Sequence, residues 1–521
     1  MAWYYTFEAK EIQSFILQSD KLREMVGGSE LVAQLCGRLL DRALEAVGVQ
    51  RPESVIVSTA AGWARMVFED EGQAREFRKY WPMLVSRYAP GLKLIDALVP
   101  IRTNLPDAVK EAIDILRGAR NMSESNLPEL GPLVERAPRT GTTAVALVKD
   151  KKMGKPVPVD RQTIRKQQYA KTHSSLTQKI SKNILDTAWP YELDDIVSDE
   201  SAYVAVVHAD GNDLGSMLMR IGEHIAKTPQ DAEKIYRMIS ECIDRITVSA
   251  VQHATEKVLF PVYQAAGEKS FIPARPIVLG GDDLTIIVRA DLAIEFTCEF
   301  LSAFERNSRA ELAELRRMIQ KFPEELTACA GVAFVKKSYP FVSAYHMAES
   351  LCDHTKRQAK QDRDSRKSGN PHPPVPSSFS FHRITTSMAE GFSEVKGQEL
   401  TGRGCFKGEP VKFWYGPYAV GDVAGKLPQY NQLNSLVQSI AELPTGSIRT
   451  LISTMHTDPV SAVKDYQRVL QVASADKSEN FHNALQALTA NTEQQLWNAD
   501  MQTPLADAHL LAGIVKGGNN A

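Results

Sequence analysis

The sequence predicts an α+β fold built from two similar sheet-and-helix units and a C-terminal region that is mainly helical. Two observations predict the paired units: the same order of strands and helices occurs twice, and each copy contains two apolar runs joined by a short turn. A third observation predicts the helical end, because residues 430–515 carry apolar side chains at helical spacing. We therefore expect two sheets and one helical bundle.

The composition is that of a multidomain globular protein. Its 521 residues exceed one ordinary core, because domains commonly hold roughly 100–200 residues. Apolar residues make up 43% of the chain and charged residues 24%, and no apolar run approaches the ~20 residues of a membrane helix. The N-terminal residues lack the pattern of a secretion signal. We expect a cytoplasmic protein with no membrane partner.

Cysteine spacing and net charge bear on two further classes of protein, those held by zinc or disulfides and those that bind nucleic acid. The six cysteines are scattered without any CxxC pair, which argues against a zinc ribbon and against a disulfide framework. The net charge of −2 gives no general case for nucleic-acid binding, so such a surface would have to be local. Residues 151–182 carry nine Lys and Arg against the single acid Asp160, which fits either a binding surface or a solvated linker.

The second unit shows the clearest pattern of strands and helices. Tyr203–Gly211 is a Val-rich run that predicts a buried strand, and Pro276–Val288 predicts a hairpin that turns at two glycines. The surrounding elements are expected to be a helix from about Leu214, a helix over about Asp231–Ala254, a helix over residues 290–307, a strand over Leu326–Val335 and a helix over Phe341–Lys360.

The first unit repeats this order with different turn residues. Val55–Phe68 aligns with the second hairpin at a constant offset of 220 residues, since residue 57 corresponds to 277 and residue 68 to 288. Ala60-Ala61-Gly62-Trp63 then falls where Gly280-Gly281-Asp282-Asp283 lies, so the acidic turn residues are missing from the first unit. Chance similarity between two α/β units is the alternative explanation.

Three aspartates form the strongest candidate site. Asp210 ends the predicted strand, Asp282 and Asp283 lie at the hairpin turn, and the chain between them is long enough for a crossover that makes the strands neighbours. Phosphoryl transfer from a triphosphate requires charge neutralisation and an aligned hydroxyl, which two divalent ions about 4 Å apart provide. Carboxylate oxygens are the ligands that Mg²⁺ and Mn²⁺ prefer. We predict that the three aspartates are catalytic and bind two Mg²⁺ or Mn²⁺ ions.

An ordinary solvent-exposed hairpin with acidic turn residues is the alternative to a catalytic site. The flanking runs PIVL and LTIIV are fully apolar, which is typical of a buried central hairpin and gives its acidic tip no structural purpose. The sequence therefore predicts two ferredoxin-like palm domains, the first degenerate and the second catalytic, plus a C-terminal helical domain. The expected boundaries are 1–125 for the first palm, 126–198 for an inserted region, 199–375 for the catalytic palm and 376–521 for the mainly helical domain.

Residues beside the aspartates are candidates for nucleotide binding. Gly280 and Gly281 suit a tight turn that needs positive φ, and their missing Cβ atoms let a nucleotide approach the backbone. Gly211 offers a main-chain carbonyl, and Lys356 lies where a predicted helix end brings a cation toward a triphosphate. Lys360 is expected to be solvated.

Three further polar residues near Asp210 have expected structural roles. Asn212 and Asp213 are predicted to form the turn after the strand. His208 alternates with apolar residues in the strand, so we expect it to be packed rather than catalytic.

Together these motifs resemble a known family. The family resemblance rests on Ala209–Gly215 (ADGNDLG), Gly280–Asp283 (GGDD), Ala348–Lys356 (AESLCDHTK) and Glu11–Val32 near the N-terminus. They are similar to the large palm-containing cyclase subunit of type III CRISPR effector complexes. A more distant resemblance is to GGDEF-type nucleotide cyclases, which share the palm.

The resemblance implies synthesis of cyclic oligoadenylate second messengers from ATP in antiviral defence. It implies that Lys356 contacts a phosphate and that Gly280 and Gly281 lie beneath the nucleotide. The implied partners are other CRISPR effector subunits, guide RNA and target RNA.

Three departures from the family pattern modify these expectations. The sequence starts directly at the first palm, without the HD nuclease domain of many members, so we expect no DNase activity. Pro132–Val148 contains no cysteine where a zinc ribbon is usual, so structural zinc is not expected. Asn212 replaces an acid that is common at its position.

Two other functions are compatible with the same residues. The chain could be a non-catalytic scaffold or nucleotide-binding subunit of an RNA-guided complex, or a stand-alone nucleotide second-messenger synthase. The motifs do not fix the base, because base selection depends on the shape and hydrogen bonds of a pocket.

Overall fold

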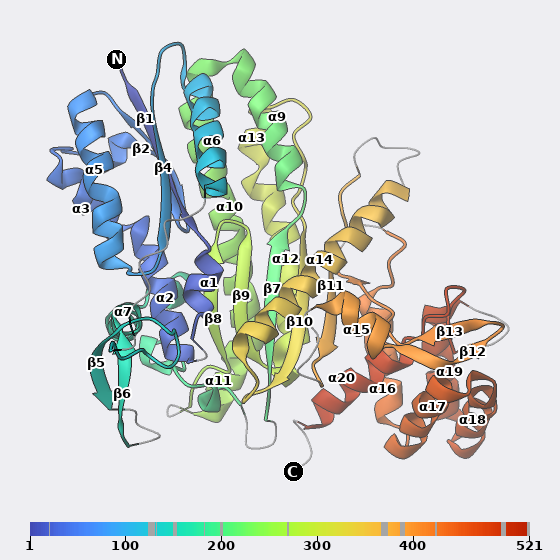
Figure 1. Ribbon diagram of the computed structural model, residues 1–521. Coiled ribbons are helices and arrows are strands. Elements are labelled where there is room, and N and C mark those ends of the chain that lie inside the picture. Colours follow the sequence, from blue (N-terminus) through green and yellow to red (C-terminus); the bar gives the residue numbers. More distant parts are fainter. Residues whose placement is uncertain are drawn as a thin grey trace.

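The computed structural model shows two large β-sheets with flanking helices, two small two-stranded sheets and a helical bundle at the C-terminal end (Figure 1). It describes residues 1–19, 21–122, 131, 133–149, 154–181, 183–197, 202–267, 270–365, 373–385, 391–421, 425–490 and 496–517. The predicted α+β class is confirmed. Within these ranges, no helix has the length and apolar character that crossing a membrane requires.

The first sheet is antiparallel and has the strand order β2-β3-β1-β4. Its apolar side chains alternate between two faces, as expected of a pleated strand: Tyr5 and Phe7 pack with one core cluster, and Tyr4 packs with another. The strands are β1 (Trp3–Lys10), β2 (Ile56–Ala60), β3 (Trp63–Phe68) and β4 (Lys93–Pro100). The helices are α1 (Ile12–Leu17), α2 (Leu22–Leu35), α3 (Arg38–Ala46), α4 (Pro52–Val55), α5 (Glu71–Tyr88) and α6 (Leu105–Asn121).

The second sheet has the order β14-β11-β10-β7-β9-β8, and its β8-β9-β7-β10 part repeats the order of the first sheet. The turn register is also repeated, because Ala60 pairs with Trp63 and Gly280 pairs with Asp283. The predicted repeat is thus confirmed at the level of topology. The strands are β7 (Tyr203–Gly211), β8 (Ala274–Gly280), β9 (Asp283–Arg289), β10 (Ala328–Lys336), β11 (Ser378–Arg383) and β14 (Tyr418–Ala419).

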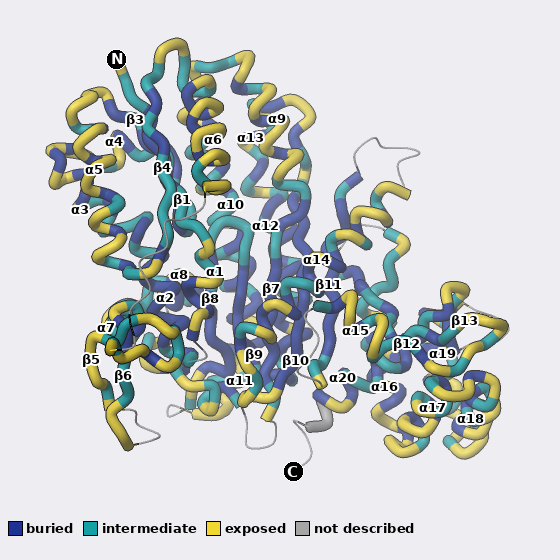
Figure 2. The backbone as a smooth tube through the Cα atoms, viewed as in Figure 1, coloured by how far each residue is buried: buried dark blue, intermediate teal, exposed yellow. Residues whose placement is uncertain are grey.

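Helices cover both faces of the second sheet. Figure 2 shows that its strands run through the most buried part of the molecule, which explains their nearly unbroken apolar sequences. The long helices α10 and α12 pack together on one face, and α14 packs against β10 and β7 on the other. The helices are α9 (Leu214–Lys227), α10 (Ala232–Ala254), α11 (Phe260–Ala266), α12 (Ala293–Glu311), α13 (Ala313–Met318) and α14 (Phe341–Ser365), with a π-helical turn at Thr255–Leu259 joining α10 to α11.

The inserted region packs into the first palm. The Lys166 side chain is buried, its Nζ donates to the carbonyl of Phe15, and its main chain fills the space where Gly27 would carry a Cβ. A solvated linker is therefore wrong for this part of the basic segment, whereas Lys151, Lys152 and Lys182 lie outside the described residues. The region contains β5 (Ala144–Lys149), β6 (Pro156–Asp160), α7 (Arg161–Thr172), α8 (Ser175–Ile180) and 3₁₀ turns at Asp186–Ala188 and Leu193–Asp195.

The C-terminal region forms the predicted helical bundle and also contains strands. β11 runs parallel to β10 and β14 pairs with β11, so the second sheet continues beyond residue 375. The helices are α15 (Phe392–Gln398), α16 (Tyr430–Ala441), α17 (Thr445–Thr457), α18 (Pro459–Val472), α19 (Ala475–Thr489) and α20 (Leu505–Gly517), and a hairpin of β12 (Thr401–Phe406) and β13 (Glu409–Lys412) precedes the bundle.

Gly331 allows α14 to lie directly on β10. A Cβ at this position would come within 2.0 Å of the Ala348 carbonyl oxygen and 2.6 Å of the Cys352 nitrogen. We expect Gly331→Ala to lower the free energy of unfolding by about 2–3 kcal/mol, since overpacking against rigid backbone forces the helix away. Gly222→Ala is the control, because a Cβ at position 222 would meet nothing within 4 Å, and it should be neutral or stabilising by roughly 0.5–1 kcal/mol. Equal chemical unfolding curves for the two variants would contradict this account.

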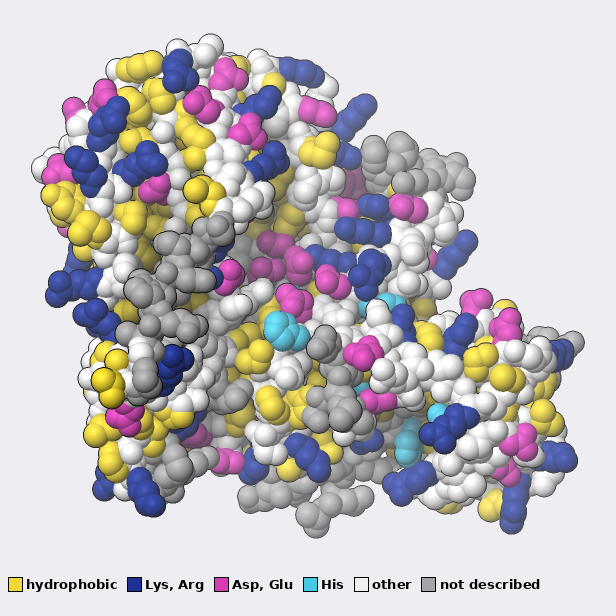
Figure 3. Space-filling model, viewed as in Figure 1, with side chains coloured by type: hydrophobic (Ala, Val, Ile, Leu, Met, Phe, Trp, Pro, Cys, Tyr) yellow, Lys and Arg dark blue, Asp and Glu magenta, His cyan; other side chains and the backbone are white. Residues whose placement is uncertain are grey.

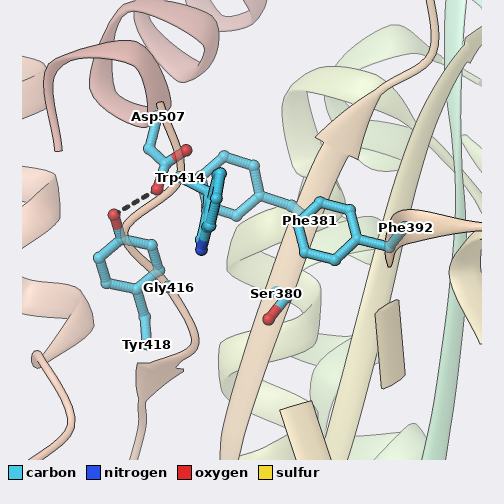
Figure 4. A pocket seen from close by; sticks show the side chains of 7 residues that line it. All are labelled: Ser380, Phe381, Phe392, Trp414, Gly416, Tyr418 and Asp507. Atoms are coloured by element: carbon cyan, nitrogen blue, oxygen red, sulfur yellow. Dashed lines mark hydrogen bonds between the residues drawn. The ribbon is translucent and has the colours of Figure 1, made fainter. Parts of the chain in front are cut away.

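Asp507, in the first turn of α20, ties the bundle to the end of the second sheet. Figure 4 shows it pointing at Tyr418, whose hydroxyl donates to it at 2.6 Å, and the main-chain N–H of Tyr415 also donates at 3.1 Å. Burial raises the pKa of Asp507 from 3.8 to about 6, although these hydrogen bonds partly offset the effect. Burial therefore favours the protonated carboxyl, even though both hydrogen bonds favour the ionised one.

This raised pKa predicts a pH-dependent difference between the wild type and Asp507→Asn. A folded pKa above the unfolded value gives a contribution to stability that is present below about pH 4 and lost as the pH rises through about 6. The melting temperature of Asp507→Asn relative to wild type should therefore increase from pH 5 to pH 8. Asp476→Asn, at an exposed position of α19, should show no such change. A constant difference for Asp507→Asn would show that its carboxyl does not titrate in this range.

Candidate active site

The end of β7 and the turn between β8 and β9 meet at one edge of the second sheet. β7 pairs antiparallel with β9 as far as Ala209 and Leu284, so Asp210 and Asp283 are next to each other at the end of the ladder. One carboxylate oxygen from each of Asp210, Asp282 and Asp283 lies within 4.8 Å of the other two. The structure thus brings together the three aspartates that the sequence singles out.

Gly280 and Gly281 are glycines for two different structural reasons. Gly281 has a positive φ of +63°, as expected for this turn, whereas Gly280 does not have a positive φ. A Cβ on Gly280 would lie 2.6 Å from the Cβ of Ala61, at the tip of the first hairpin. The neighbour that requires a glycine at position 280 in this structure is therefore the first palm.

Gly211 allows the turn to approach the end of β7. A Cβ on Gly211 would lie 3.0 Å from the Cβ of Asp282 and 3.2 Å from its carboxylate. The absence of a side chain at position 211 therefore helps to set the separation of Asp282 from Asp210.

The carboxylates are part-buried and carry unfavourable like charges. The pKa of Asp282 is raised to about 8 by burial first, and then by a hydrogen bond with Asp210 and the charges of Asp283 and Asp210. Burial also raises the pKa of Asp283 to about 7, with Asp210 adding to the shift and Lys356 opposing it. Such a cluster favours protons or cations as partners.

Lys356 supplies the nearest positive charge. Its Nζ forms an ion pair with Asp210 Oδ2. Burial opposes the charged form, but the Asp210 carboxylate and its hydrogen bond outweigh burial and raise the pKa of Lys356. Lys360 is exposed, in agreement with the expected solvated role.

Glu349 is a residue near the site that the sequence pattern did not single out. Its charge acts on Asp283, and its carboxylate accepts a hydrogen bond from the Tyr345 hydroxyl at 3.4 Å. Tyr345, Glu349 and Lys356 recur on α14 at intervals of four and seven residues, which places them on one helix face. This helical spacing is the sequence signal from which Glu349 could have been identified as a site residue.

The residues around Asp210 take structural roles. Asn212 is buried rather than a simple turn former: its main-chain N–H donates to the Thr327 carbonyl at 2.8 Å and its Nδ2 to Thr327 Oγ1 at 3.0 Å. Asp213 adopts a left-handed conformation before α9 and pairs with Arg363 at 2.7 Å. His208 is packed as expected, with Nδ1 3.1 Å from Thr285 Oγ1 and with a pKa lowered by burial.

The first palm has a partial counterpart of this site. Glu8 pairs with Trp63 across β1 and β3, and Trp63 aligns with Asp283, so Glu8 corresponds to Asp210. Glu8 forms an ion pair with Arg120, from the end of α6. The first palm lacks the turn acids, as the sequence indicated, but it keeps one carboxylate at the position that corresponds to Asp210. This carboxylate was not predicted, because strand register cannot be seen in the sequence.

The donor set fits a divalent metal ion. Three carboxylate oxygens close to one another are hard ligands of the kind that Mg²⁺ and Mn²⁺ prefer, and the raised pKa values indicate negative charge that needs a counter-ion. Asp210, Asp282 and Asp283 are the residues that would hold it. Figure 3 shows acidic side chains gathered in a hollow near the centre of this face, with basic side chains beside them.

The second sheet with its acidic turn has the features of a palm domain. Residues 203–366 match the family model described as "Cas10/Cmr2, second palm domain". This part of the chain is therefore a Cas10-like palm domain, as the sequence motifs predicted. No curated protein matches the sequence.

Solved structures with a similar fold come from Csm1–Csm4 cassettes. The cassette in complex with cA4 has a TM-score of 0.48 and 13% identity, covering 98% of this chain and 70% of that chain. The complex with pppApApA has a TM-score of 0.49 and 13% identity, covering 98% and 69%. The complex with pppApA has a TM-score of 0.40 and 13% identity, covering 68% and 53%, so this chain spans about half the length of that relative.

Metal binding should be measurable as a shift in melting temperature. We expect Mn²⁺ to stabilise the wild type, by about 2.7 kcal/mol at one hundred times the dissociation constant, and to leave Asp282→Asn/Asp283→Asn unchanged. In EDTA the double variant should be at least as stable as wild type, because it removes like charges. Asp213→Asn is the control: it lies beside the cluster but outside it, so it should keep the Mn²⁺ shift. An equal shift in the double variant would exclude the aspartates as ligands.

Proposed function

We propose that this protein is a metal-dependent nucleotidyltransferase that makes cyclic oligoadenylates from ATP in CRISPR-type antiviral defence. The observation that carries the proposal is the cluster of Asp210, Asp282 and Asp283, with oxygens within 4.8 Å of one another, on a Cas10-like palm. Joining a nucleotide to a hydroxyl requires divalent ions held by carboxylates next to a space open to solvent. All three aspartates are only partly buried, so solvent reaches the cluster.

Each site residue has a proposed part in the reaction. The three aspartates hold two Mg²⁺ or Mn²⁺ ions, which when bound neutralise the triphosphate and favour ionisation of the attacking hydroxyl. Lys356, which faces Asp210, binds a phosphate oxygen of ATP through its ammonium group. Gly281 leaves open space beside the nucleotide, whereas Gly280 and Gly211, whose Cβ positions are taken by Ala61 and Asp282, contribute main-chain atoms to the nucleotide site.

The proposed setting is a ribonucleoprotein complex in the cytoplasm. The partners are other CRISPR effector subunits, guide RNA and target RNA, with bound target RNA switching the activity on. These partners follow from the family resemblance of the motifs.

The retained carboxylates favour catalysis over a purely structural role. A scaffold subunit has no need for clustered acids whose pKa values are raised by burial and by mutual repulsion, as those of Asp282 and Asp283 are. In the first palm, where the turn reads Ala60-Ala61-Gly62-Trp63, the same fold forms without acidic turn residues. The acids are therefore not required for folding a palm.

Product analysis tests the proposal. Wild type and Asp282→Asn/Asp283→Asn are incubated with each NTP and Mg²⁺ or Mn²⁺, alone and with the effector subunits, guide RNA and target RNA, and the products are identified by chromatography and mass spectrometry. We expect cyclic oligoadenylates from wild type with ATP and none from the double variant. Synthesis without RNA partners would favour a stand-alone synthase.

Asp213→Asn is again the matched control, and it should retain product formation because its carboxylate pairs with Arg363 outside the cluster. Absence of product from wild type in every combination would overturn the proposed activity and leave the scaffold role. A product formed from GTP but not from ATP would show that the substrate base is guanine rather than adenine.

A further inference from the structure

The first palm contacts the catalytic turn of the second palm directly. The hairpin tips meet where Ala61 lies against Gly280, so closely that no Cβ fits on Gly280. Gly280 is the last residue of β8 and precedes Gly281 and Asp282 in the turn. The position of the acidic turn is therefore limited on one side by a methyl group of the first palm.

Helix α10 provides a second connection between the first palm and the turn. On this helix, Arg237 donates to the Ile56 carbonyl at 3.0 Å, and Ser240 Oγ donates to the Thr59 carbonyl at 2.7 Å. Both carbonyls belong to β2, the edge strand of the first sheet. The edge strand thus fixes α10 through two side chains.

The same helix binds the catalytic turn about two turns further on. Thr247, which is fully buried, lies seven residues after Ser240 and so on the same side of α10. Its Oγ1 is 2.7 Å from the Gly281 carbonyl and 3.0 Å from the Ile243 carbonyl of its own helix. A hydroxyl has one hydrogen to donate, and the shorter contact is the one to the turn.

A reciprocal contact joins the first palm to β8 of the second palm. Ser29, on α2 of the first palm, donates to the Ile277 carbonyl on β8. β8 is the edge strand of the second sheet and ends at the catalytic turn. Each palm therefore uses a helix hydroxyl to fix the edge strand of the other.

We propose that the degenerate first palm positions the catalytic turn, with Thr247 and Ala61 as the positioning residues. The contacts of α10 with β2 fix the position of the helix, and the hydrogen bond from Thr247 on this helix fixes the position of Gly281. Ala61 limits the movement of Gly280. Together they set the place of Asp282 relative to Asp210. The positioning role itself can be tested by Mn²⁺ binding. Only the test by enzymatic activity rests on the proposed function.

The main test compares Thr247→Val with Thr247→Ser in the full chain. Valine keeps the shape but removes the hydroxyl, whereas serine keeps the hydroxyl. Removing a residue that orients metal ligands typically weakens metal affinity 10–100-fold, so we expect Thr247→Val to weaken Mn²⁺ binding at least tenfold and Thr247→Ser to restore it to near the wild-type value. Mn²⁺ binding is followed by electron paramagnetic resonance.

Thr255→Val is the matched control for loss of a buried hydroxyl. Thr255 is fully buried just after α10, and its Oγ1 has no hydrogen-bond partner among the described residues. We expect wild-type Mn²⁺ affinity from this variant. An equal loss of affinity in Thr255→Val and Thr247→Val would show a general effect of helix stability and would overturn the proposal.

Ala61→Val gives a second test that does not alter the helix. A branched side chain at this tip presses on Gly280, so Mn²⁺ binding should weaken at temperatures where the variant is still folded in EDTA. Unchanged Mn²⁺ affinity in both Ala61→Val and Thr247→Val would refute the positioning role. If only one of the two variants folds, unchanged Mn²⁺ affinity in that variant would refute it.

The activity readout separates this inference from the proposed function. If wild type makes product, Thr247→Val should lower kcat at saturating ATP, because it moves the turn that carries the metal ligand Asp282. If wild type makes no product but Thr247→Val weakens Mn²⁺ binding, the proposed activity fails and the positioning role stands. Normal kcat together with normal Mn²⁺ affinity would refute the positioning role alone.

Discussion

The antiparallel pairing of β7 with β9 is the interaction on which the candidate site depends. It brings a strand end and a hairpin turn from distant parts of the chain to the same edge of a sheet. Three carboxylates are thereby held at a separation that charge repulsion alone would not permit. The apolar side chains of the two strands, buried on both faces, hold the carboxylates in place, and Lys356 compensates one of the negative charges.

The two palms separate the requirements of the fold from those of the chemistry. Both have the same strand order and the same turn register, although one turn is acidic and the other is not. Even the carboxylate-cation pair is repeated, as Glu8 with Arg120 and as Asp210 with Lys356. Topology thus follows from the apolar pattern of the strands, whereas the capacity to bind metal follows from a few residues at their ends.

The sequence was sufficient for those features that depend on local pattern. Strand and helix periodicity predicted the order of elements, and the constant offset between the hairpins predicted the repeated topology. The proximity of Asp210 to Asp282 followed from the expectation that both ends belong to neighbouring strands. These features depend on short stretches of chain and on general rules of sheet assembly.

Features that depend on packing between distant segments could not be predicted. Glu8 was missed because strand register is not visible in one sequence, and the buried Lys166 was indistinguishable from its solvated neighbours in a basic segment. Gly280 was assigned to nucleotide approach, but the residue that contacts it here is Ala61. Thr247 has no motif around it, because its importance comes from the carbonyl of a residue 34 positions away.

The contact between Ala61 and Gly280 has a consequence for how such a chain can evolve. Because one methyl group fills the space between the hairpin tips, the two positions share a fixed volume. Enlarging either residue requires the other to be smaller, and position 280 already has no side chain to give up. The duplicated halves can therefore diverge freely in charge and chemistry, but at this point of contact their sequences are tied to each other.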